Sequence, residues 1–138
     1  MKQLSVFLEN EPNTLYKLVE LLAKNNINLR TINIAETKEF GVARLIVDKV
    51  DTAIIALRAG NYACKETEVL AIEVPDVIGG LSKVIGCFNK SDLNIEYMYS
   101  ILEKVKGNAV MIMKFKDIAK AKELAKKEGI GIYEGGIE

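Results

Sequence analysis

The sequence predicts an α+β fold made of two similar units, each with the element order βαββαβ. Three observations lead to this prediction. A chain of 138 residues is long enough for two small domains. Its second half repeats the first at a shift of 66 positions, which places Leu70 on Leu4. Both halves show the same succession of strand-like and helix-like segments. We expect the first domain at 1–66 and the second at 67–138.

The repeat keeps one register from the first strand to the second helix of each unit, without a gap. Its identical pairs are Leu4 and Leu70, Leu15 and Leu81, Lys17 and Lys83, Lys24 and Lys90, Asn28 and Asn94, Gly41 and Gly107, Ala43 and Ala109, Ile46 and Ile112, and Asp51 and Asp117. So constant a register is hard to obtain by chance and indicates a duplication.

Each unit opens with a strand and a helix. Segments 3–9 and 68–74 are apolar or alternate between apolar and polar residues, as strands do. A helix is expected after each of these strands. The pairs Asn25-Asn26 and Ser91-Asp92 are expected to end these helices. The apolar residues at helical spacing are Leu15, Leu18, Val19 and Leu22 in one unit and Leu81, Val84, Ile85 and Phe88 in the other.

A hairpin is expected next in each unit, because two runs rich in β-branched, aromatic or aliphatic residues follow the helix. Gly41 and Gly107 are expected in the turns, whose type stays open. The hairpin strands are expected at 29–36 and 42–47 in the first unit, and at 95–102 and 108–115 in the second.

A second helix and a fourth strand complete each unit. Asp51 and Asp117 are well placed to cap the second helices. Segments 61–67 and 129–134 are expected as the fourth strands. This order is that of the ferredoxin-like split βαβ fold, in which two helices cover one face of a four-stranded antiparallel sheet.

Strand residues that are apolar on both faces point to a second layer. In a sheet with one solvent-exposed face, apolar and polar residues alternate along each strand. Residues 109–115 are instead apolar at nearly all consecutive positions, and Tyr97, Met98 and Tyr99 place large side chains on both faces. Helices cover one face, so the other is expected to pack on a second sheet, from the partner unit or from a second chain. We favour a homodimer. The short join at 64–68 is expected to dock the two units.

The composition narrows the function classes. Lys plus Arg and Asp plus Glu number 19 each, so there is no basic excess for nucleic-acid binding. Histidine, the commonest general base and metal ligand, is absent, and no metal or cofactor is expected. Cys64 and Cys87 form no CxxC pair and are expected as buried thiols. No apolar run approaches the roughly twenty residues of a membrane span, and no signal peptide is recognisable, so a cytoplasmic protein is expected.

The loop between the first strand and the first helix is a candidate site in each unit. It meets a helix N-terminus, whose N–H groups and dipole favour a carboxylate or phosphate. Asn10 or Asp76 can cap that helix, and ordinary capping alone would also explain these residues. Gly79 and Gly80 let the backbone approach a ligand. Asn13, which tolerates positive φ, stands in the place of Gly79.

A second polar feature is shared by the two units. Asn28 and Asn94 both enter the second strand, just past the end of the helix. An asparagine side chain offers a donor and an acceptor. It can therefore pair with the carboxylate and the ammonium of a free amino acid.

At these residues the chain resembles a known family. The run LSVFLENEPNTLYKLVELLAKNNINLRTINIAE looks like the start of an ACT domain, a small ligand-binding regulatory module of amino-acid metabolism. It is particularly similar to the first ACT domain of acetolactate synthase regulatory subunits, where an ENEPGAL-type loop precedes an Asn-Ile pair. The run IEVPDVIGGLSKVIGCFNKSDLNIEYMYS carries the more general ACT pattern of an Asp-x-x-Gly-x-Leu loop and a later Asn-Ile. The resemblance spans nearly the whole chain and implies a stand-alone tandem ACT protein.

The resemblance implies amino-acid binding at interfaces between ACT modules, with contacts from the first loop and the start of the second strand. Asn13 replaces the family glycine, and Ile78 stands where the family often has proline, which leaves open whether both sites bind. The first site would consist of Asn10, Glu11, Pro12, Asn13, Thr14, Leu15, Asn28 and Leu29. The second would consist of Asp76, Val77, Ile78, Gly79, Gly80, Leu81, Asn94 and Ile95.

We therefore expect a non-catalytic sensor that binds a free amino acid and passes its occupancy to a partner enzyme or regulator. The alternative is a structural adaptor subunit with no free ligand. An enzyme would have to rely on Tyr97 and Tyr99 with Glu73 or Asp76, and no nucleophile–base pair supports that. A nucleic-acid binder of this fold would need stacking aromatics on the third strand, and a metal carrier would need cysteines in the first loop.

Overall fold

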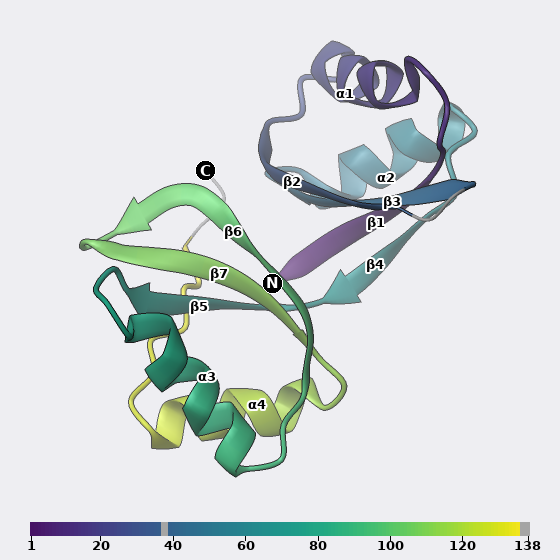
Figure 1. Cartoon of the computed structure of the whole chain (residues 1–138). Coiled ribbons are helices and arrows are strands. Elements are labelled where there is room, and N and C mark those ends of the chain that lie inside the picture. Colours follow the sequence, from purple (N-terminus) through teal and green to yellow (C-terminus); the bar gives the residue numbers. More distant parts are fainter. Residues whose placement is uncertain (37–38, 136–138) are drawn as a thin grey trace. The chain divides into compact units, whose positions relative to one another are not determined.

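The structure is a computed structural model that describes residues 1–36 and 39–135 (Figure 1). The chain divides into two compact units, one of Lys2–Thr67 and one of Glu68–Gly135 with Met1. In each unit two helices cover one face of an antiparallel sheet. The predicted α+β architecture of two ferredoxin-like units is confirmed.

The first unit has the six predicted elements. Its sheet has the strand order β2-β3-β1-β4, in which β1 and β2 both pair antiparallel with β3. This is the order of the ferredoxin-like fold. The elements are β1 (Lys2–Glu9), α1 (Thr14–Lys24), β2 (Leu29–Glu36), β3 (Phe40–Val47), α2 (Val50–Ala59) and β4 (Cys64–Glu68).

The second unit repeats this arrangement with three regular strands in the order β5-β7-β6. The predicted fourth strand at 129–134 is reduced to a single bridge between Ile72 and Ile132. Gly129 and Gly131 fall in this segment, and glycine weakens a strand. The elements are β5 (Leu70–Pro75), α3 (Gly80–Lys90), β6 (Ile95–Val105), β7 (Asn108–Phe115) and α4 (Ile118–Lys127).

The register between the two units is not constant, contrary to the prediction. Leu4 pairs with Leu45, whereas Leu70, 66 positions after Leu4, pairs with Met113, 68 positions after Leu45. The third strands and all later elements therefore correspond at a shift of 68. The predicted equivalences Gly41 and Gly107, Ala43 and Ala109, Ile46 and Ile112, and Asp51 and Asp117 are wrong.

The change of register is explained by a bulge in β6. Its residues 101–103 face Val110 alone, whereas Ala35 alone faces Val42 in the first unit. Two extra residues therefore extend the hairpin arm of the second unit. A smaller bulge, at the start of β2 and of β6, is common to both units and supports their shared origin.

The two hairpin glycines differ in role. Lys106 and Gly107 have φ values of 52° and 80° between the paired residues Val105 and Asn108. Positive φ at both central residues is typical of a two-residue type I′ turn. Gly41 lies inside β3 instead, so its predicted place in a turn is wrong. Residues 37–38, between β2 and β3, lie outside the described residues.

The structure confirms some of the predicted helix ends and caps and contradicts one of them. Asn26 and Asp92 both have φ of 56° directly after the helix caps, which confirms the predicted ends of α1 and α3. The Asp117 side chain caps α4 by accepting a hydrogen bond of 3.1 Å from the Lys120 N–H. Asp51 lies inside the first turn of α2, whose N-cap is Lys49, so its predicted capping role is wrong.

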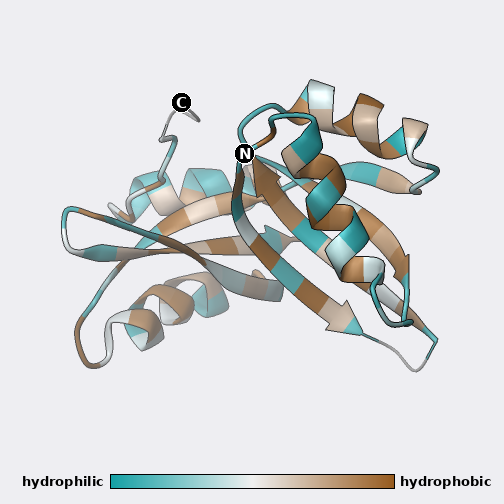
Figure 2. Cartoon of the chain, turned by 90° about the horizontal axis from the view of Figure 1, so that it is seen from above, coloured by the Kyte–Doolittle hydropathy of each residue, from teal (hydrophilic) through white to brown (hydrophobic). Residues whose placement is uncertain are grey.

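Each unit has its own core between helices and sheet, and Figure 2 shows apolar residues gathered on one side of the helices. In the second unit the rings of Phe88 and Phe115 lie 4.8 Å apart. The first core is aliphatic. Packing of the other sheet faces, between units or chains, stays a prediction. No helix of the described residues is long and apolar enough to cross a membrane.

Candidate functional site

The loops before α1 and α3 have the same backbone conformation. The Glu11 N–H donates to the Glu9 carbonyl and the Val77 N–H to the Pro75 carbonyl, both at 2.9 Å. Asn13 and Gly79 then adopt left-handed φ values of 70° and 82°. The prediction that Asn13 tolerates the conformation of a glycine is confirmed.

The predicted capping by Asn10 or Asp76 is wrong. The N-caps are Asn13, whose side chain makes no capping bond, and Gly79, which has no side chain. Asp76 instead accepts a hydrogen bond of 2.7 Å from the Lys104 ammonium. This hydrogen bond and the lysine charge lower the pKa of the Asp76 carboxyl. Lys104 reaches the loop from the extended arm of β6, which no local sequence pattern indicates.

The two adjacent glycines of the second loop have different tasks. A Cβ at Gly80 would lie 2.2 Å from the Pro75 carbonyl oxygen, so Gly80 lets the start of α3 pack on the end of β5. A Cβ at Gly79 would meet no atom within 4 Å, so that position is open to a ligand. In the first unit Thr14 takes the place of Gly80, and its hydroxyl donates to the carbonyls of Glu9 and Glu11.

The remaining loop residues are exposed and differ in polarity. The second loop presents Val77 and Ile78 to solvent where the first has Glu11 and Pro12. Leu15 and Leu81, at equivalent positions in the helices, are also exposed. The second loop is therefore the more apolar of the two candidate contact surfaces.

Asn28 and Asn94 lie at the starts of β2 and β6 with exposed side chains. The Asn28 N–H donates to Asp48 Oδ1 at 2.9 Å, and the Asp48 N–H donates back to the Asn28 carbonyl at 3.2 Å. The Asn28 backbone is thereby fixed and its side-chain amide faces outward. Asn94 borders an open hollow of about 380 Å³.

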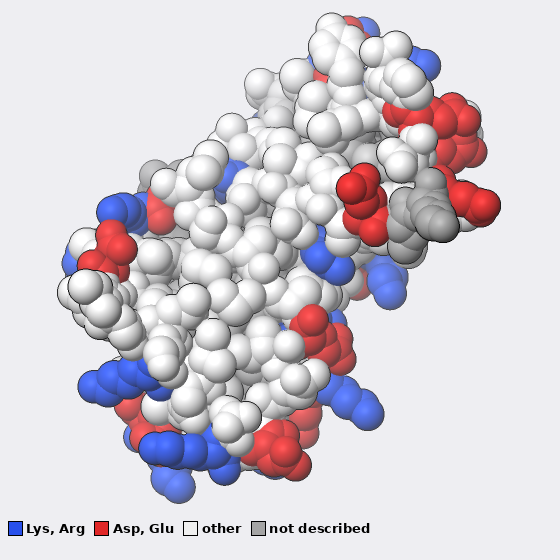
Figure 3. Space-filling model, in the orientation of Figure 1, with Lys and Arg blue, Asp and Glu red and all other residues white. Residues whose placement is uncertain are grey.

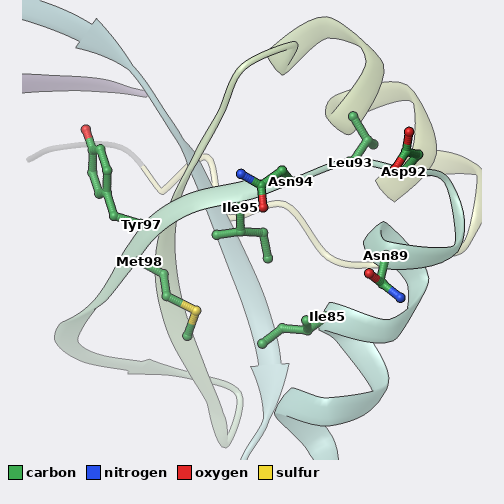
Figure 4. Close-up of a pocket in the computed structure, with 8 residues that line it drawn as sticks. All are labelled: Ile85, Asn89, Asp92, Leu93, Asn94, Ile95, Tyr97 and Met98. Atoms are coloured by element: carbon green, nitrogen blue, oxygen red, sulfur yellow. The ribbon is translucent and has the colours of Figure 1, made fainter.

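Residues from the end of α3 and the start of β6 surround this hollow (Figure 4). Asn89 supplies a second amide that sequence reasoning missed. Its signal was a polar residue one helical turn after Ile85, where the first unit has Ala23. The lining residues are Ile85, Asn89, Asp92, Leu93, Asn94, Ile95, Tyr97 and Met98.

The loop and the asparagine of one unit do not come together. Pro75, next to the loop, pairs with Asn108 at one end of β7, whereas Ile95, next to Asn94, pairs with Phe115 at the other end. Seven strand steps separate those ends by roughly 24 Å. In the first unit the corresponding pairs also lie at opposite ends of β3. Each predicted residue set thus forms two separate places, not one pocket within a unit.

Charge on the surface is mixed. Figure 3 shows acidic and basic side chains interspersed around the units, with no continuous basic stripe on the face in view. That face therefore lacks the continuous positive charge that would bind a nucleic-acid backbone.

Comparisons with known proteins agree with this architecture. The structure of protein BT0572 from Bacteroides thetaiotaomicron is 38% identical, with a TM-score of 0.89 over 96% of this chain and 90% of that one. The ligand-free regulatory subunit of aspartate kinase from Thermus thermophilus is 16% identical, with a TM-score of 0.62 over 91% of each chain. The small subunit of acetolactate synthase from Thermotoga maritima is 14% identical over 96% of this chain and 89% of its own, with a TM-score of 0.41, too low to bear on function.

A search of curated protein sequences found no significant match. The family model described as "ACT domain pair" matches residues 1–132, nearly the whole chain. With the repeated βαββαβ units and the loop geometry that the two halves share, this match shows that the chain belongs to the ACT domain pair family.

Proposed function

We propose that this protein is a non-catalytic sensor that binds a free amino acid and transmits its occupancy to a partner enzyme or regulator. ACT domains are regulatory modules, and the fold is shared with a regulatory subunit of aspartate kinase. The observation that carries the proposal is the hollow beside Asn94, which combines two amides and a carboxylate with an apolar wall.

The chemistry of this hollow suits a zwitterion. Asn89 and Asn94 each offer an amide donor for a carboxylate and a carbonyl acceptor for an ammonium group. Asp92 adds a negative charge for the ammonium. Ile85 and Met98 supply apolar surface for a side chain. Pockets of this kind typically pair a mostly apolar wall with a few placed polar groups.

A complete site would require two modules. Within one unit the loop lies at the opposite end of the sheet from the asparagine. A ligand that touches both features must therefore take them from different ACT modules. The Gly80 N–H already donates to the Val77 carbonyl and the Lys83 N–H to the Gly79 carbonyl. The loop of the second module would therefore supply the N–H groups of Leu81 and Ser82, which have no helix carbonyl one turn earlier to donate to.

This arrangement explains how binding could be transmitted. A ligand held by two modules favours the packing in which both contacts are made, and a partner that distinguishes this packing responds to the ligand. We propose that the partner is an enzyme or regulator of amino-acid metabolism and that the protein acts as a homodimer.

A thermal-shift screen against the twenty amino acids tests the proposal. A ligand at a hundredfold excess over its dissociation constant should stabilise the protein by about 2.7 kcal/mol. For any amino acid that binds, Asn94→Ala should weaken binding about tenfold, the effect of losing about 1.4 kcal/mol. Asn28→Ala is the matched control, because the first unit has Ala23 and Asn26 in the places of Asn89 and Asp92, and it should weaken binding less.

Two outcomes would contradict parts of this proposal. If no amino acid shifts the unfolding temperature at about 10 mM, far above the usual range of dissociation constants, the protein is an adaptor without a free ligand. Equal binding by wild type, Asn28→Ala and Asn94→Ala would refute the role of the second strand.

A further inference from the structure

A second hollow of about 380 Å³ lies wholly within the second unit, away from Asn94. It is bordered by the first half of α3, by the end of β5 and by the segment that follows α4. Val84 and Ile130 give it apolar walls, and the free thiol of Cys87 is half-buried at its side. Its volume is within the range of about 300–1,000 Å³ that is usual for small-molecule sites.

The first unit shows why this hollow exists. The matching hydrogen bonds of Tyr62 to Leu57 and of Ile130 to Ala125 establish that Tyr62 corresponds to Ile130. Leu21 corresponds to Cys87 on the first helices.

In the first unit these larger residues fill the space. A Cβ added at Gly60, the counterpart of Glu128, would lie 2.9 Å from Leu21 Cδ2 and 3.3 Å from Tyr62 Cδ2. The second unit has the smaller Cys87 and Ile130 instead, and the space stays open.

The polar residues of the hollow also differ from those of the first unit. Glu73 stands where the first unit has Phe7, and Glu128 stands where it has Gly60. Lys83 has the counterpart Lys17, so a lysine here is not particular to the hollow. What distinguishes the second unit is therefore smaller apolar side chains together with two added carboxylates.

We propose that this hollow binds a small organic cation, a primary amine on a short apolar chain. Within the described part of the chain, the carboxylates of Glu73 and Glu128 have no hydrogen bond or ion pair. A half-buried carboxylate such as Glu73 gains from a charged partner. Val84 and Ile130 would contact the alkyl chain. The proposal does not depend on amino-acid binding at Asn94.

Protection of Cys87 from a maleimide tests this on the native protein. Hexylamine, butylamine and phenethylamine are the probes, and hexanoate, with the opposite charge, is the control. A ligand at ten times its dissociation constant leaves about a tenth of the sites free, so labelling of Cys87 should slow about tenfold. Cys64, the free thiol of the first unit, should label at an unchanged rate. No protection by any of the amines, or equal protection by hexanoate, would overturn the proposal.

Two kinds of variant test the volume of the hollow and its charges separately. Amine binding is measured by calorimetry. Cys87→Leu with Ile130→Tyr copies the first unit and should abolish amine binding by filling the space. Glu73→Gln and Glu128→Gln keep the volume, and at least one should weaken binding about tenfold by removing a charge-assisted hydrogen bond. Unchanged binding by the filled variant, or by both glutamine variants, would refute the site even if one of them folds poorly.

Discussion

Asn13 and Gly79 are different residues in one backbone conformation, and they show what residue type alone can predict. A φ near 70–80° is costly for most residues but not for glycine, and less so for asparagine. That constraint is local, so the sequence predicts it correctly. The partner of Asp76 is not local, because Lys104 follows it by 28 positions and reaches it through an insertion. Capping was therefore the wrong expectation for Asp76.

Replacement of Gly79 by alanine should destabilise the protein by about 1 kcal/mol, since alanine disfavours left-handed φ. Gly86→Ala is the matched control. It also has open space for a Cβ, but it lies in the interior of α3, where alanine should stabilise by about 0.5–1 kcal/mol. Urea unfolding of both variants measures the difference. Effects of the same sign would mean that φ does not decide the outcome.

The Asp76–Lys104 pair should be visible in a pH titration. The pKa of Asp76 is lowered from 3.8 by Lys104, so its stabilising effect is present above that value and disappears as the pH falls through the lowered pKa. Carboxyl NMR shifts should show the Asp76 pKa rising toward 3.8 in Lys104→Met and under high salt. Lys106→Met, in the adjacent turn, is the control and should move the Asp76 pKa far less.

At the scale of elements, strands and helices were predicted well and their correspondence was not. Hydrophobic periodicity and turn residues located the first three strands and both helices of each unit. The predicted equivalences beyond β6 are wrong, because no sequence pattern marks the bulge at 101–103. Beyond this bulge, residues that are identical at a shift of 66 do not occupy equivalent positions. The sequence places Asn94 at the start of the second strand, where the structure has it, but it does not indicate that Asn89 lines the same hollow, because the end of α3 and the start of β6 meet only after folding.

The two aspartates once expected to be equivalent should behave differently. Asp117→Ala removes a side-chain cap from α4 and should cost about 1 kcal/mol. Asp51→Ala removes a charge in the first turn of α2, worth about 0.3–1 kcal/mol at most. Chemical denaturation of the two variants measures both effects. A larger loss for Asp51→Ala would contradict the cap assignment.

At the scale of the whole molecule, a single ACT module cannot unite the loop and the asparagine, so association between modules is central to the proposed function. β2 and β6 lie at the sheet edges of their units. An edge strand is the position at which a sheet can be extended by another strand. How modules associate depends on surfaces brought together by packing, and the sequence pattern indicates only that those surfaces are apolar.

We expect a homodimer in solution. Sedimentation should give twice the chain mass of 15.3 kDa at micromolar concentration. Amino-acid binding should shift the dimerisation constant if the ligand contacts modules of both chains. A monomer at high micromolar concentration would exclude the dimer and leave the two modules of one chain as the partners.

The two extra residues of β6 also say something about how the halves diverged. Side chains alternate between the faces of a strand, so two added residues leave the faces of the arm beyond them unchanged, whereas one added residue has to be absorbed by a bulge. Met113 and Phe115, both fully buried, accordingly occupy the core positions that Leu45 and Val47 have in the first unit. The arm of this hairpin can therefore differ in length by two residues between the halves while the core positions of both third strands stay the same.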